Sequence, residues 1–334
     1  MRRALLVLIV AAAIAALAIR EYRIHNQTPL GEAFVGSDGA TVWNSTAPIR
    51  SPVGKLNYGQ HVFVYQRDAH ESLVSTRTGI RGWISSGSLI DPKLWRTALE
   101  LAQKTDEMPV QAVGHTIARA NLHTTPGIHA PVILQAPADS PLTVLQHSAV
   151  VSGSGALANS GGGSVENWWL VRTKRKTTGR VAGWVLGRLI TLDLPSVLAE
   201  YQSSEDMNIV AWFEIDHVRD VRSGRIRPEY LVAGVRGRPV GCDFTLLRVY
   251  TWSSARERYE TAFMDSNVCG KLPVEVTPAK SALQDAYFRF VNVTPSGTEE
   301  RAYRMRLTTV RRMNPESAAA KDARKSDAIQ KDRS

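Results

Sequence analysis

The sequence contains few of the side chains on which most enzyme active sites depend. Among its 334 residues are two cysteines, Cys242 and Cys269, and eight histidines, the last of which is His217. A papain-like peptidase needs a cysteine thiolate and a histidine base that the fold brings together, and that base is expected from a strand later than the cysteine. Because no histidine follows either cysteine, we do not expect a cysteine peptidase.

Other catalytic signatures are also missing. No two histidines have the one-face helical spacing of a zinc peptidase, and no Gly-x-Ser-x-Gly elbow occurs. His123 and His129 lie in a predicted turn without a nearby carboxylate or cysteine. We therefore predict no catalytic residues, no metal site and no cofactor. Aspartate and glutamate are plentiful, so a carboxylate pair of the glycosidase kind stays open as an enzymatic alternative.

The net charge of +10 is not concentrated in one segment. Basic and acidic residues are interspersed, and no stretch has the Lys/Arg-rich stripe that is typical of a nucleic-acid-binding surface. We predict that the protein does not bind nucleic acid. Anionic wall polymers and lipid head groups are both suitable partners for diffuse positive charge.

The first 24 residues have the order of regions found in an export signal. A short basic start, Met1-Arg2-Arg3, precedes sixteen uncharged apolar residues at 4–19, and arginines follow. A helix of that length spans ~24 Å, somewhat less than a hydrocarbon core of ~30 Å, and Ala16-Leu17-Ala18 fits a small-x-small cleavage site. Residues 1–24 are thus predicted to be either a cleaved signal peptide or a transmembrane helix that anchors the protein in the inner membrane. Both place the remainder in the periplasm or another extracytoplasmic part of the cell envelope.

An oxidising compartment gives the two cysteines a simple role as one disulfide bond. The segments 244–252 and 258–263 have strand patterns, and Ser253–Glu257 is typical of the loop of a hairpin between them. Pairing across that loop brings positions near Cys242 opposite positions near 267. Cys242 and Cys269 are therefore predicted to be bridged, which contributes ~3–4 kcal/mol in the chain-entropy account.

Short apolar runs broken by Gly, Pro, Asn and Asp predict β-structure from residue 37 onward. Two copies of one pattern can be aligned. Ser51-Pro52-Val53 matches Ala130-Pro131-Val132, and Gly82-Trp83-Ile84 matches Gly183-Trp184-Val185. In the same alignment Trp43 matches Leu122. Six later strand signals predict a third, antiparallel β-domain.

These patterns divide the chain into eight segments. A Gly/Ser-rich insert cannot pack a core, and a polar tail with few apolar residues cannot fold by itself. The predicted segments are 1–24, signal peptide or anchor; 25–36, linker; 37–91, first repeat; 92–114, a helical connector capped by Asp91; 115–193, second repeat with the Gly/Ser-rich insert 152–164; 194–206, linker; 207–313, C-terminal β-domain; and 314–334, disordered tail.

The two copies resemble the bacterial SH3-like, or SH3b, family. The resemblance rests on a Ser/Thr-containing turn before Pro-Val and on the closing Gly-Trp-[Ile/Val] followed by a leucine, and it covers about 37–91 and 115–193. It implies two tandem small β-barrels in an envelope protein. An arginine that the family often carries near the start of the repeat is absent from both copies. Such repeats often accompany cell-wall peptidases, which is the only support for an enzymatic role.

The aromatic residues divide into expected core positions and expected ligand-binding positions. Trp83 and Trp184 follow the glycine of each closing motif and are predicted to pack in the barrel cores. The predicted ligand-binding residues, which fall at or near predicted loops, are Trp43, Tyr58, Trp168 and Trp169. If the two adjacent tryptophans belong to a strand they point to opposite faces, so one of them is expected to be exposed.

These observations favour an all-β exported protein that binds and does not catalyse. The predicted fold class is two tandem SH3-like barrels and a C-terminal antiparallel β-domain, with an N-terminal membrane helix. The repeats are predicted to dock on peptidoglycan or on an envelope protein through loop aromatics and convergent polar groups. The alternative is a cell-wall hydrolase that uses carboxylates of the C-terminal domain.

Overall fold

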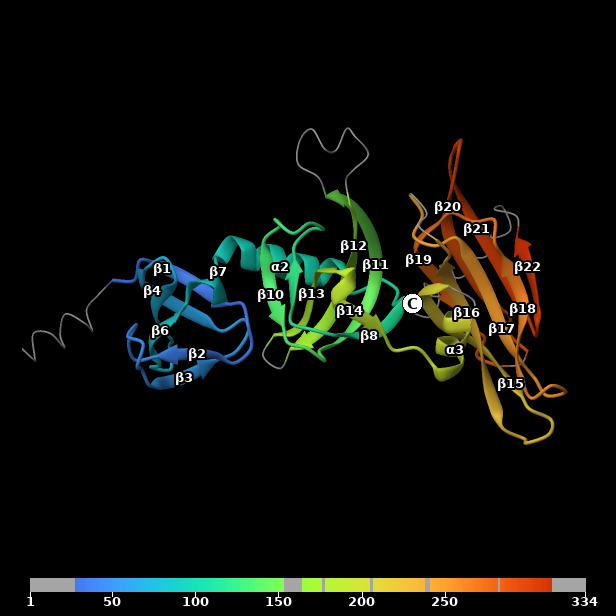
Figure 1. Cartoon of the computed structure of the whole chain (residues 1–334), viewed down its shortest axis with the longest axis horizontal. Coiled ribbons are helices and arrows are strands. Elements are labelled where there is room, and N and C mark those ends of the chain that lie inside the picture. Colours follow the sequence, from blue (N-terminus) through green and yellow to red (C-terminus); the bar gives the residue numbers. More distant parts are fainter. Residues whose placement is uncertain are drawn as a thin grey trace, which may run out of the picture. The chain divides into compact units, whose positions relative to one another are not determined.

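The computed structural model describes residues 28–152, 164–175, 178–204, 207–237, 241–281 and 283–313. The predicted N-terminal segment 1–24, residues 153–163 of the Gly/Ser-rich insert and the tail 314–334 lie outside these ranges. Within them the chain is mostly β-structure in antiparallel sheets (Figure 1), and no helix combines the length and the apolar character needed to cross a membrane. The chain divides into two compact units, 1–96 and 97–334, and each is described by itself.

The first unit is built around one seven-stranded antiparallel sheet, which we name repeat 1. Its strand order is β3-β2-β6-β5-β4-β1-β7. The strands are β1 (Gly31–Val35), β2 (Ala40–Trp43), β3 (Pro52–Leu56), β4 (His61–Arg67), β5 (Glu71–Ser75), β6 (Arg81–Ser85) and β7 (Leu89–Ile90), with a 3-10 helix, η1 (Ser86–Ser88), before the last. Burial alternates along β4, so that Val62 and Val64 enter the core while Phe63 and Tyr65 lie on the other face.

Strand β1 corrects the predicted linker 25–36. Ala33 and Val35 are fully buried, and β1 pairs with both β4 and β7. Only two residues of this strand face inward, and one is an alanine. The period-2 pattern is therefore too short and too weakly apolar to indicate a strand in the sequence.

The second unit begins with a sheet of the same topology, which we name repeat 2. Its strand order is β10-β9-β13-β12-β11-β8-β14, which is the order of repeat 1 with each strand number raised by seven. The strands are β8 (Ala112–Thr116), β9 (Ala120–His123), β10 (Val132–Ala136), β11 (Pro141–Ser152), β12 (Ser164–Arg175), β13 (Gly179–Leu186) and β14 (Ile190–Leu192), with the 3-10 helix η3 (Gly187–Leu189) at the place of η1.

Two helices accompany the repeats. Helix α2 (Pro92–Lys104) begins as predicted, because Asp91 Oδ1 accepts the backbone N–H groups of Lys93 and Leu94, each at 2.9 Å. Strand β8 starts inside the predicted connector 92–114, which corrects that boundary. Helix α3 (Ser196–Ser204) lies within the predicted linker 194–206.

The rest of the second unit is a two-sheet sandwich, 208–313. One four-stranded sheet contains β15 (Asn208–Arg219), β16 (Ile226–Val235), β17 (Leu246–Ser253) and β18 (Arg258–Asp265). The other contains β19 (Gly270–Thr277), β20 (Ala286–Thr294), β21 (Gly297–Arg306) and β22 (Thr309–Met313). Strand β19 was not expected, since Pro273 within it removes a ladder donor. Residues 301–310, which carry the last of the six strand signals, belong to two strands, β21 and β22, joined by a turn.

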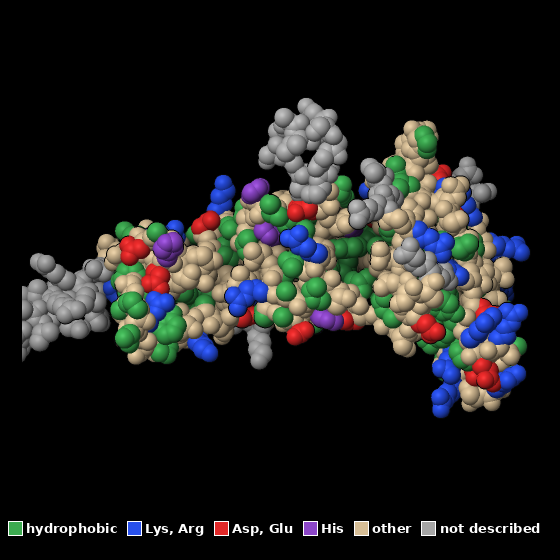
Figure 2. Space-filling view, in the orientation of Figure 1, with side chains coloured by type: hydrophobic (Ala, Val, Ile, Leu, Met, Phe, Trp, Pro, Cys, Tyr) green, Lys and Arg blue, Asp and Glu red, His purple; other side chains and the backbone are tan. Residues whose placement is uncertain are grey.

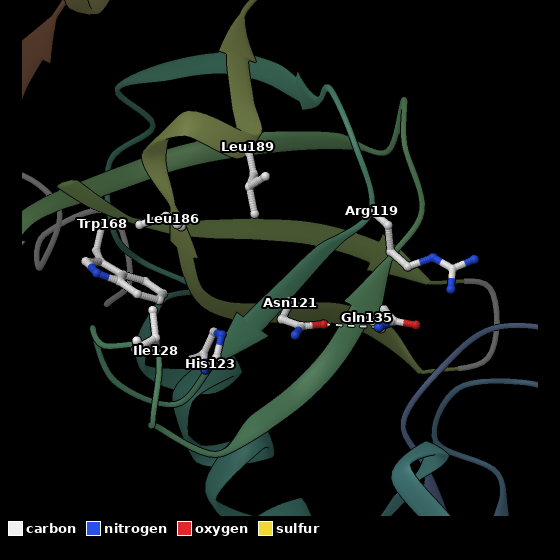
Figure 3. Close-up of a pocket in the computed structure, with 8 residues that line it drawn as sticks. All are labelled: Arg119, Asn121, His123, Ile128, Gln135, Trp168, Leu186 and Leu189. Carbon is white, nitrogen blue, oxygen red and sulfur yellow. Dashed lines mark hydrogen bonds between the residues drawn. The ribbon is translucent and has the colours of Figure 1, made fainter. Parts of the chain in front are cut away.

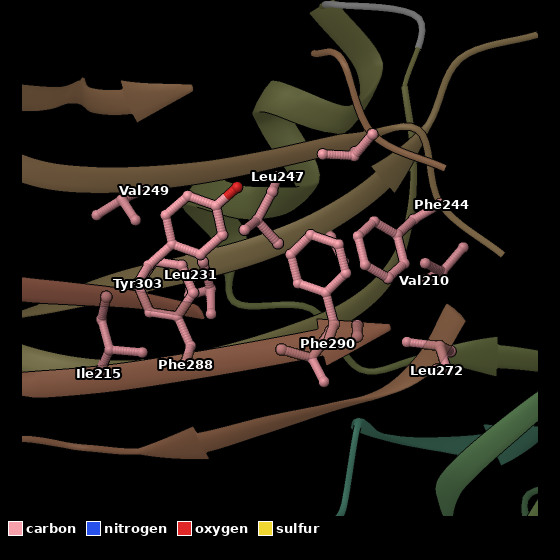
Figure 4. Packing of buried hydrophobic residues seen from close by; sticks show 14 of the residues in the cluster. Val210, Ile215, Leu231, Phe244, Leu247, Val249, Leu272, Phe288, Phe290 and Tyr303 are labelled. Atoms are coloured by element: carbon pink, nitrogen blue, oxygen red, sulfur yellow. The ribbon is translucent and has the colours of Figure 1, made fainter. Parts of the chain in front are cut away.

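Aromatic side chains fill the space between the two sheets (Figure 4). Phe288 and Tyr303 stack with their ring centroids 5.1 Å apart, and Phe244 meets Phe290 edge to face at 5.0 Å. Burial of rings this large dominates the stabilisation of a small sandwich.

Candidate functional site: a pocket in repeat 2

The closing Gly-Trp pair occupies equivalent places in both sheets. Trp83 lies opposite Trp43 of β2 in repeat 1, and Trp184 lies opposite His123 of β9 in repeat 2. The glycine is required because the strands approach closely at this point. A Cβ on Gly82 would lie 2.3 Å from the carbonyl oxygen of Trp43.

The prediction that Trp83 and Trp184 form the cores is corrected by this arrangement. Side chains alternate along a strand, and Ile84 and Val185 take the inward direction with exposed fractions of 1% and 0%. The two tryptophans consequently lie half-buried on the opposite face of each sheet. Their rings form part of an outer surface, on which the two repeats can be compared residue by residue.

The strand register also shifts the sequence alignment by one residue. Trp43 corresponds to His123, not to Leu122, because each lies opposite the tryptophan of the closing motif. Pro52 pairs with Trp43, and Val132 pairs with His123. Aligning the two Pro-Val sequences therefore places inward-facing side chains of β2 opposite outward-facing side chains of β9 in the alignment, and the reverse.

A pocket of about 280 Å³ opens on this outer surface in repeat 2 (Figure 3). This volume is close to the lower limit of sites that enclose small ligands, roughly 300 Å³. Strands β9, β10, β12 and β13, the β9–β10 loop and η3 contribute its walls. The lining residues are Arg119, Asn121, His123, Ile128, Gln135, Trp168, Leu186 and Leu189.

One end of the pocket is polar. Asn121 and Gln135 are opposite one another on β9 and β10, and Gln135 Nε2 donates to Asn121 Oδ1 at 3.2 Å. Each amide keeps further donors or acceptors for a ligand. Arg119 stands at the margin with an exposed guanidinium, and it forms no ion pair or hydrogen bond with any described residue.

The other end is formed by Trp168, His123 and Ile128. Trp168 is 1% exposed, and the His123 ring meets the indole edge to face at 5.2 Å. His123 Nδ1 lies 2.7 Å from the carbonyl oxygen of Ala130. Since a carbonyl only accepts, Nδ1 carries the hydrogen, and in the neutral ring Nε2 is an acceptor. Among the described residues, the Trp168 indole N–H has no hydrogen-bond partner.

The same position in repeat 1 is occupied by the protein's own side chains. Arg50, in the β2–β3 loop, lies over the Trp43 ring at 4.7 Å and forms an ion pair with Glu71. Glu71 corresponds to Trp168, because these residues lie opposite Ser85 and Leu186 at matching positions. A cation over an aromatic ring and a paired carboxylate close the surface that repeat 2 leaves open.

The four aromatic residues predicted to bind a ligand have different surroundings in the structure. Tyr58 is 1% exposed and packs against Trp95 at 5.4 Å, so its assignment to a binding groove is wrong. Trp43 lies under Arg50. Trp168 lines the pocket, and Trp169 packs against the sandwich core and against the His147 ring at 4.7 Å. A tyrosine beside Gly59 has the pattern of a turn, but distant residues of the chain bury it.

The polar pocket residues were not identified from the sequence. A signal existed for two of them. Asn121 lies between the buried residues Ala120 and Leu122, and Gln135 lies between Leu134 and Ala136. A polar residue within such an alternating pattern marks the exposed face of a strand, but only the fold brings both strands together.

The cysteine prediction is confirmed. Cys242 and Cys269 form a disulfide with their Cα atoms 4.8 Å apart. Beside it, Asp243 Oδ1 lies 2.9 Å from His147 Nδ1 and 3.3 Å from Lys271 Nζ. Burial raises the pKa of Asp243, but the hydrogen bond from His147, the backbone N–H of Leu272 and the nearby positive charges leave it below its ordinary value. This buried pair connects repeat 2 to the sandwich.

A carboxylate pair exists in the sandwich, away from the pocket residues. Asp216 lies opposite Glu229, and the two are 8% and 2% exposed. The pKa of Glu229 is raised to about 7, chiefly because the carboxyl group is buried. The Thr251 hydroxyl, which donates to Glu229, opposes the shift, and the nearby Asp216 adds to it. Among the described residues, no three His, Cys, Asp or Glu side chains are grouped so that they could hold a metal ion.

No protein-family model and no curated protein matches this chain. Solved structures with some similarity include NlpC2 from Trichomonas vaginalis, at 14% identity over 49% of this chain and 48% of that chain, with a TM-score of 0.17. NlpC1 from Trichomonas vaginalis matches at 11% identity over 72% and 88%, with a TM-score of 0.17. An NlpC/P60 family protein from Bacillus cereus ATCC 10987 matches at 12% identity over 69% and 93%, with a TM-score of 0.21. The chain spans about half the length of NlpC2. At TM-scores this low, the similarities carry no statement about function.

Proposed function

We propose that this protein is a non-catalytic exported binding protein, and that its ligand site is the pocket of repeat 2. In this proposal the two seven-stranded sheets are SH3-like barrels of the SH3b type. Their matching strand order and their short antiparallel strands support that assignment. The ligand is a peptidoglycan component or, failing that, a protein of the cell envelope.

The observation that carries the proposal is the pocket itself. An apolar end formed by Trp168 and Ile128, next to a polar end formed by Asn121 and Gln135, is the usual composition of a site that binds a small polar group by its shape. None of the lining residues is an aspartate, a glutamate, a serine or a cysteine. The lining therefore supplies binding groups and lacks the serine, cysteine and carboxylate nucleophiles that most hydrolases use.

The disulfide supports a location in an oxidising, extracytoplasmic compartment. In such a compartment the protein is in contact with wall polymers and with other envelope proteins. Residues 4–19 would bring it there, either as a cleaved signal or as an inner-membrane anchor.

Sedimentation with isolated cell-wall sacculi tests this function. We expect the purified protein to be retained, and the double variant Asn121→Ala/Gln135→Ala to lose at least about fivefold in retention, since two hydrogen-bonding groups are removed. Thr41 and Lys55 pair at the equivalent places of repeat 1, so Thr41→Ala/Lys55→Arg is the matched control. Equal retention of both double variants would contradict the assignment of the pocket. Crosslinking to an envelope protein in place of sacculi would identify the partner as a protein.

A second candidate is a wall hydrolase that uses Asp216 and Glu229. The raised pKa of Glu229 favours it, because a carboxylic acid that stays protonated near neutral pH can act as a general acid. Release of soluble fragments from sacculi by the wild-type protein, abolished by Glu229→Gln, would support catalysis. Retention without release supports the binding protein.

A further inference from the structure

The ends of two hairpins in the sandwich form a basic surface, which we name the basic tip. It consists of residues 219–227, at the end of the β15–β16 hairpin, and 254–260, at the end of the β17–β18 hairpin. These segments contain six arginines, no lysine and three carboxylates. Figure 2 shows the blue side chains gathered at the lower right of the molecule, over the free ends of these strands.

Hydrogen bonds build the tip in advance of any ligand. Asp220 is 3% exposed, and it accepts hydrogen bonds from the Ser223 hydroxyl at 2.5 Å and from the backbone N–H of Arg222 at 3.2 Å. The backbone N–H of Val221 donates to Ser254 Oγ at 3.2 Å, which connects the two hairpins. The arginines therefore project from an ordered backbone, so little backbone conformational entropy is lost when they bind.

The carboxylates of the tip are already satisfied within it. Arg222 pairs with Glu257 at 2.7 Å, and Arg256 pairs with Glu260 at 2.6 Å. Asp220 accepts from its own turn. Arg225 is exposed, and its guanidinium contacts no acid among the described residues. The tip thus keeps a positive excess that is free to meet an anionic surface.

Two aliphatic side chains stand exposed among these arginines. Val221 is 82% exposed in the turn, and Ile226 is 63% exposed where β16 begins. A soluble polyanion would neutralise the arginines but would leave both aliphatic groups in water. A lipid bilayer satisfies both, because anionic head groups meet the guanidinium groups and the interfacial region accepts aliphatic side chains.

We propose that the basic tip docks on an anionic lipid surface. Val221 and Ile226 enter the head-group region. Arg225 contacts phosphates together with Arg219, which is exposed and donates to the carbonyl oxygen of Gly224 at 3.1 Å. This is a membrane contact of the sandwich, separate from any contact made by residues 4–19. It does not depend on the ligand of the repeat 2 pocket.

Hydrogen–deuterium exchange of the full chain tests the proposal at the tip itself, so that binding through the N-terminal segment does not interfere. Vesicles of phosphatidylcholine with about one third phosphatidylglycerol are compared with pure phosphatidylcholine. We expect the backbone amides of 219–227 to be protected only by the anionic vesicles. An arginine near an anionic surface changes partitioning roughly fivefold, so Arg219→Ser/Arg225→Ser should weaken this protection about 25-fold in lipid concentration.

Two further variants make the outcome decisive. Arg77→Ser/Arg96→Ser removes the same charge from exposed arginines of the first unit and should leave protection of the tip within about twofold of wild type. Val221→Ser/Ile226→Ser keeps every charge and should lose protection by about tenfold. If the tip is not protected by anionic vesicles, the proposal fails. It fails equally if soluble polyphosphate protects the tip as well as vesicles do and the Val221→Ser/Ile226→Ser variant behaves like wild type, because the tip is then a polyanion site.

Discussion

Repeat 1 and repeat 2 share one strand order, yet one closes its outer surface and the other leaves a pocket. In repeat 1, Arg50 covers Trp43 and pairs with Glu71. The matching positions in repeat 2 are His123 and Trp168, and the loop that would supply an arginine supplies Ile128. The backbone topology is the same, so the difference arises from side chains: these three, and Asn121 and Gln135 at the places of Thr41 and Lys55.

The comparison indicates how a duplicated fold can separate stability from binding. A surface closed by an internal ion pair needs no ligand to satisfy its charged groups. An open surface leaves amide groups and an aromatic edge for a partner. We therefore expect changes in repeat 1 to affect the free energy of unfolding, and changes in the repeat 2 pocket to affect ligand retention.

The largest expected effect on stability comes from replacing Gly82 and Gly183, the glycines that let β2 approach β6 and β9 approach β13. In Gly82→Ala the new Cβ would meet the backbone oxygen of Trp43 at 2.3 Å, whereas in Gly183→Ala it would meet the Leu122 side chain at 2.8 Å. The atom met in repeat 2 is the Leu122 Cβ, which is fixed by its backbone, so neither neighbour can rotate away. The overlap is deeper in repeat 1, and we therefore expect losses of about 3 kcal/mol for Gly82→Ala and about 1–2 kcal/mol for Gly183→Ala in the free energy of unfolding. Urea unfolding with hydrogen exchange assigns each loss to its repeat. Equal losses would show that the strand approach is the same in both.

The sandwich extends the comparison to Glu229, a buried carboxyl group that has no cationic partner among the described residues. The folded pKa of Glu229, about 7, lies above its ordinary value of 4.5. Folding therefore disfavours the ionised form, and stability falls as pH rises from about 4.5 to about 7. Glu229→Gln removes this penalty and should stabilise the protein by about 2–3 kcal/mol at pH 8, with no gain at pH 4. If the free energies of unfolding of the two proteins differ by the same amount at every pH between 4 and 8, the pKa of Glu229 is not raised by burial.

Much of the architecture follows from the sequence, because strand alternation and the Gly-Trp landmarks depend on local chemistry. The disulfide was also predictable, since two cysteines in an exported chain have one simple pairing. The direction in which the Trp83 side chain points was not predictable. Its size suggested the core, but the glycine before it and the isoleucine after it already held the inward positions.

The pocket could not be predicted for a different reason. Matching Pro52-Val53 with Pro131-Val132 is reasonable in sequence, yet irregular pairing next to Trp43 and near Val132 decides the true register. A shift of one residue turns His123 from the counterpart of Asn44 in the sequence alignment into the counterpart of Trp43. The pocket then requires four strands and a loop that only the folded sheet brings together.

The next smaller effect tests whether an arginine over the pocket closes it. The substitution Ile128→Arg gives the β9–β10 loop a cation next to the rings of His123 and Trp168, in the way that Arg50 lies over the Trp43 ring. Ile128 is 54% exposed, so the fold should tolerate the change. We expect retention on sacculi to fall roughly tenfold, equivalent to about 1.4 kcal/mol. Ile117→Arg, at a residue that is 55% exposed and outside the pocket lining, adds the same charge and should retain wild-type binding.

The smallest effect belongs to the ion pair that closes repeat 1. The Arg50 and Glu71 side chains are 27% and 19% exposed, so solvent screens part of their attraction. A double-mutant cycle of Arg50→Ala and Glu71→Gln, measured by urea unfolding, should give a coupling of about 1 kcal/mol that declines with added salt. Ile128→Ala in repeat 2 should change the free energy of unfolding by less than about 0.5 kcal/mol, because an exposed loop residue has little packing to lose. A coupling near zero would mean that Arg50 covers Trp43 without holding the surface closed. Repeat 1 would then be a second open site, and Arg50→Ala alone should increase retention of the protein on sacculi.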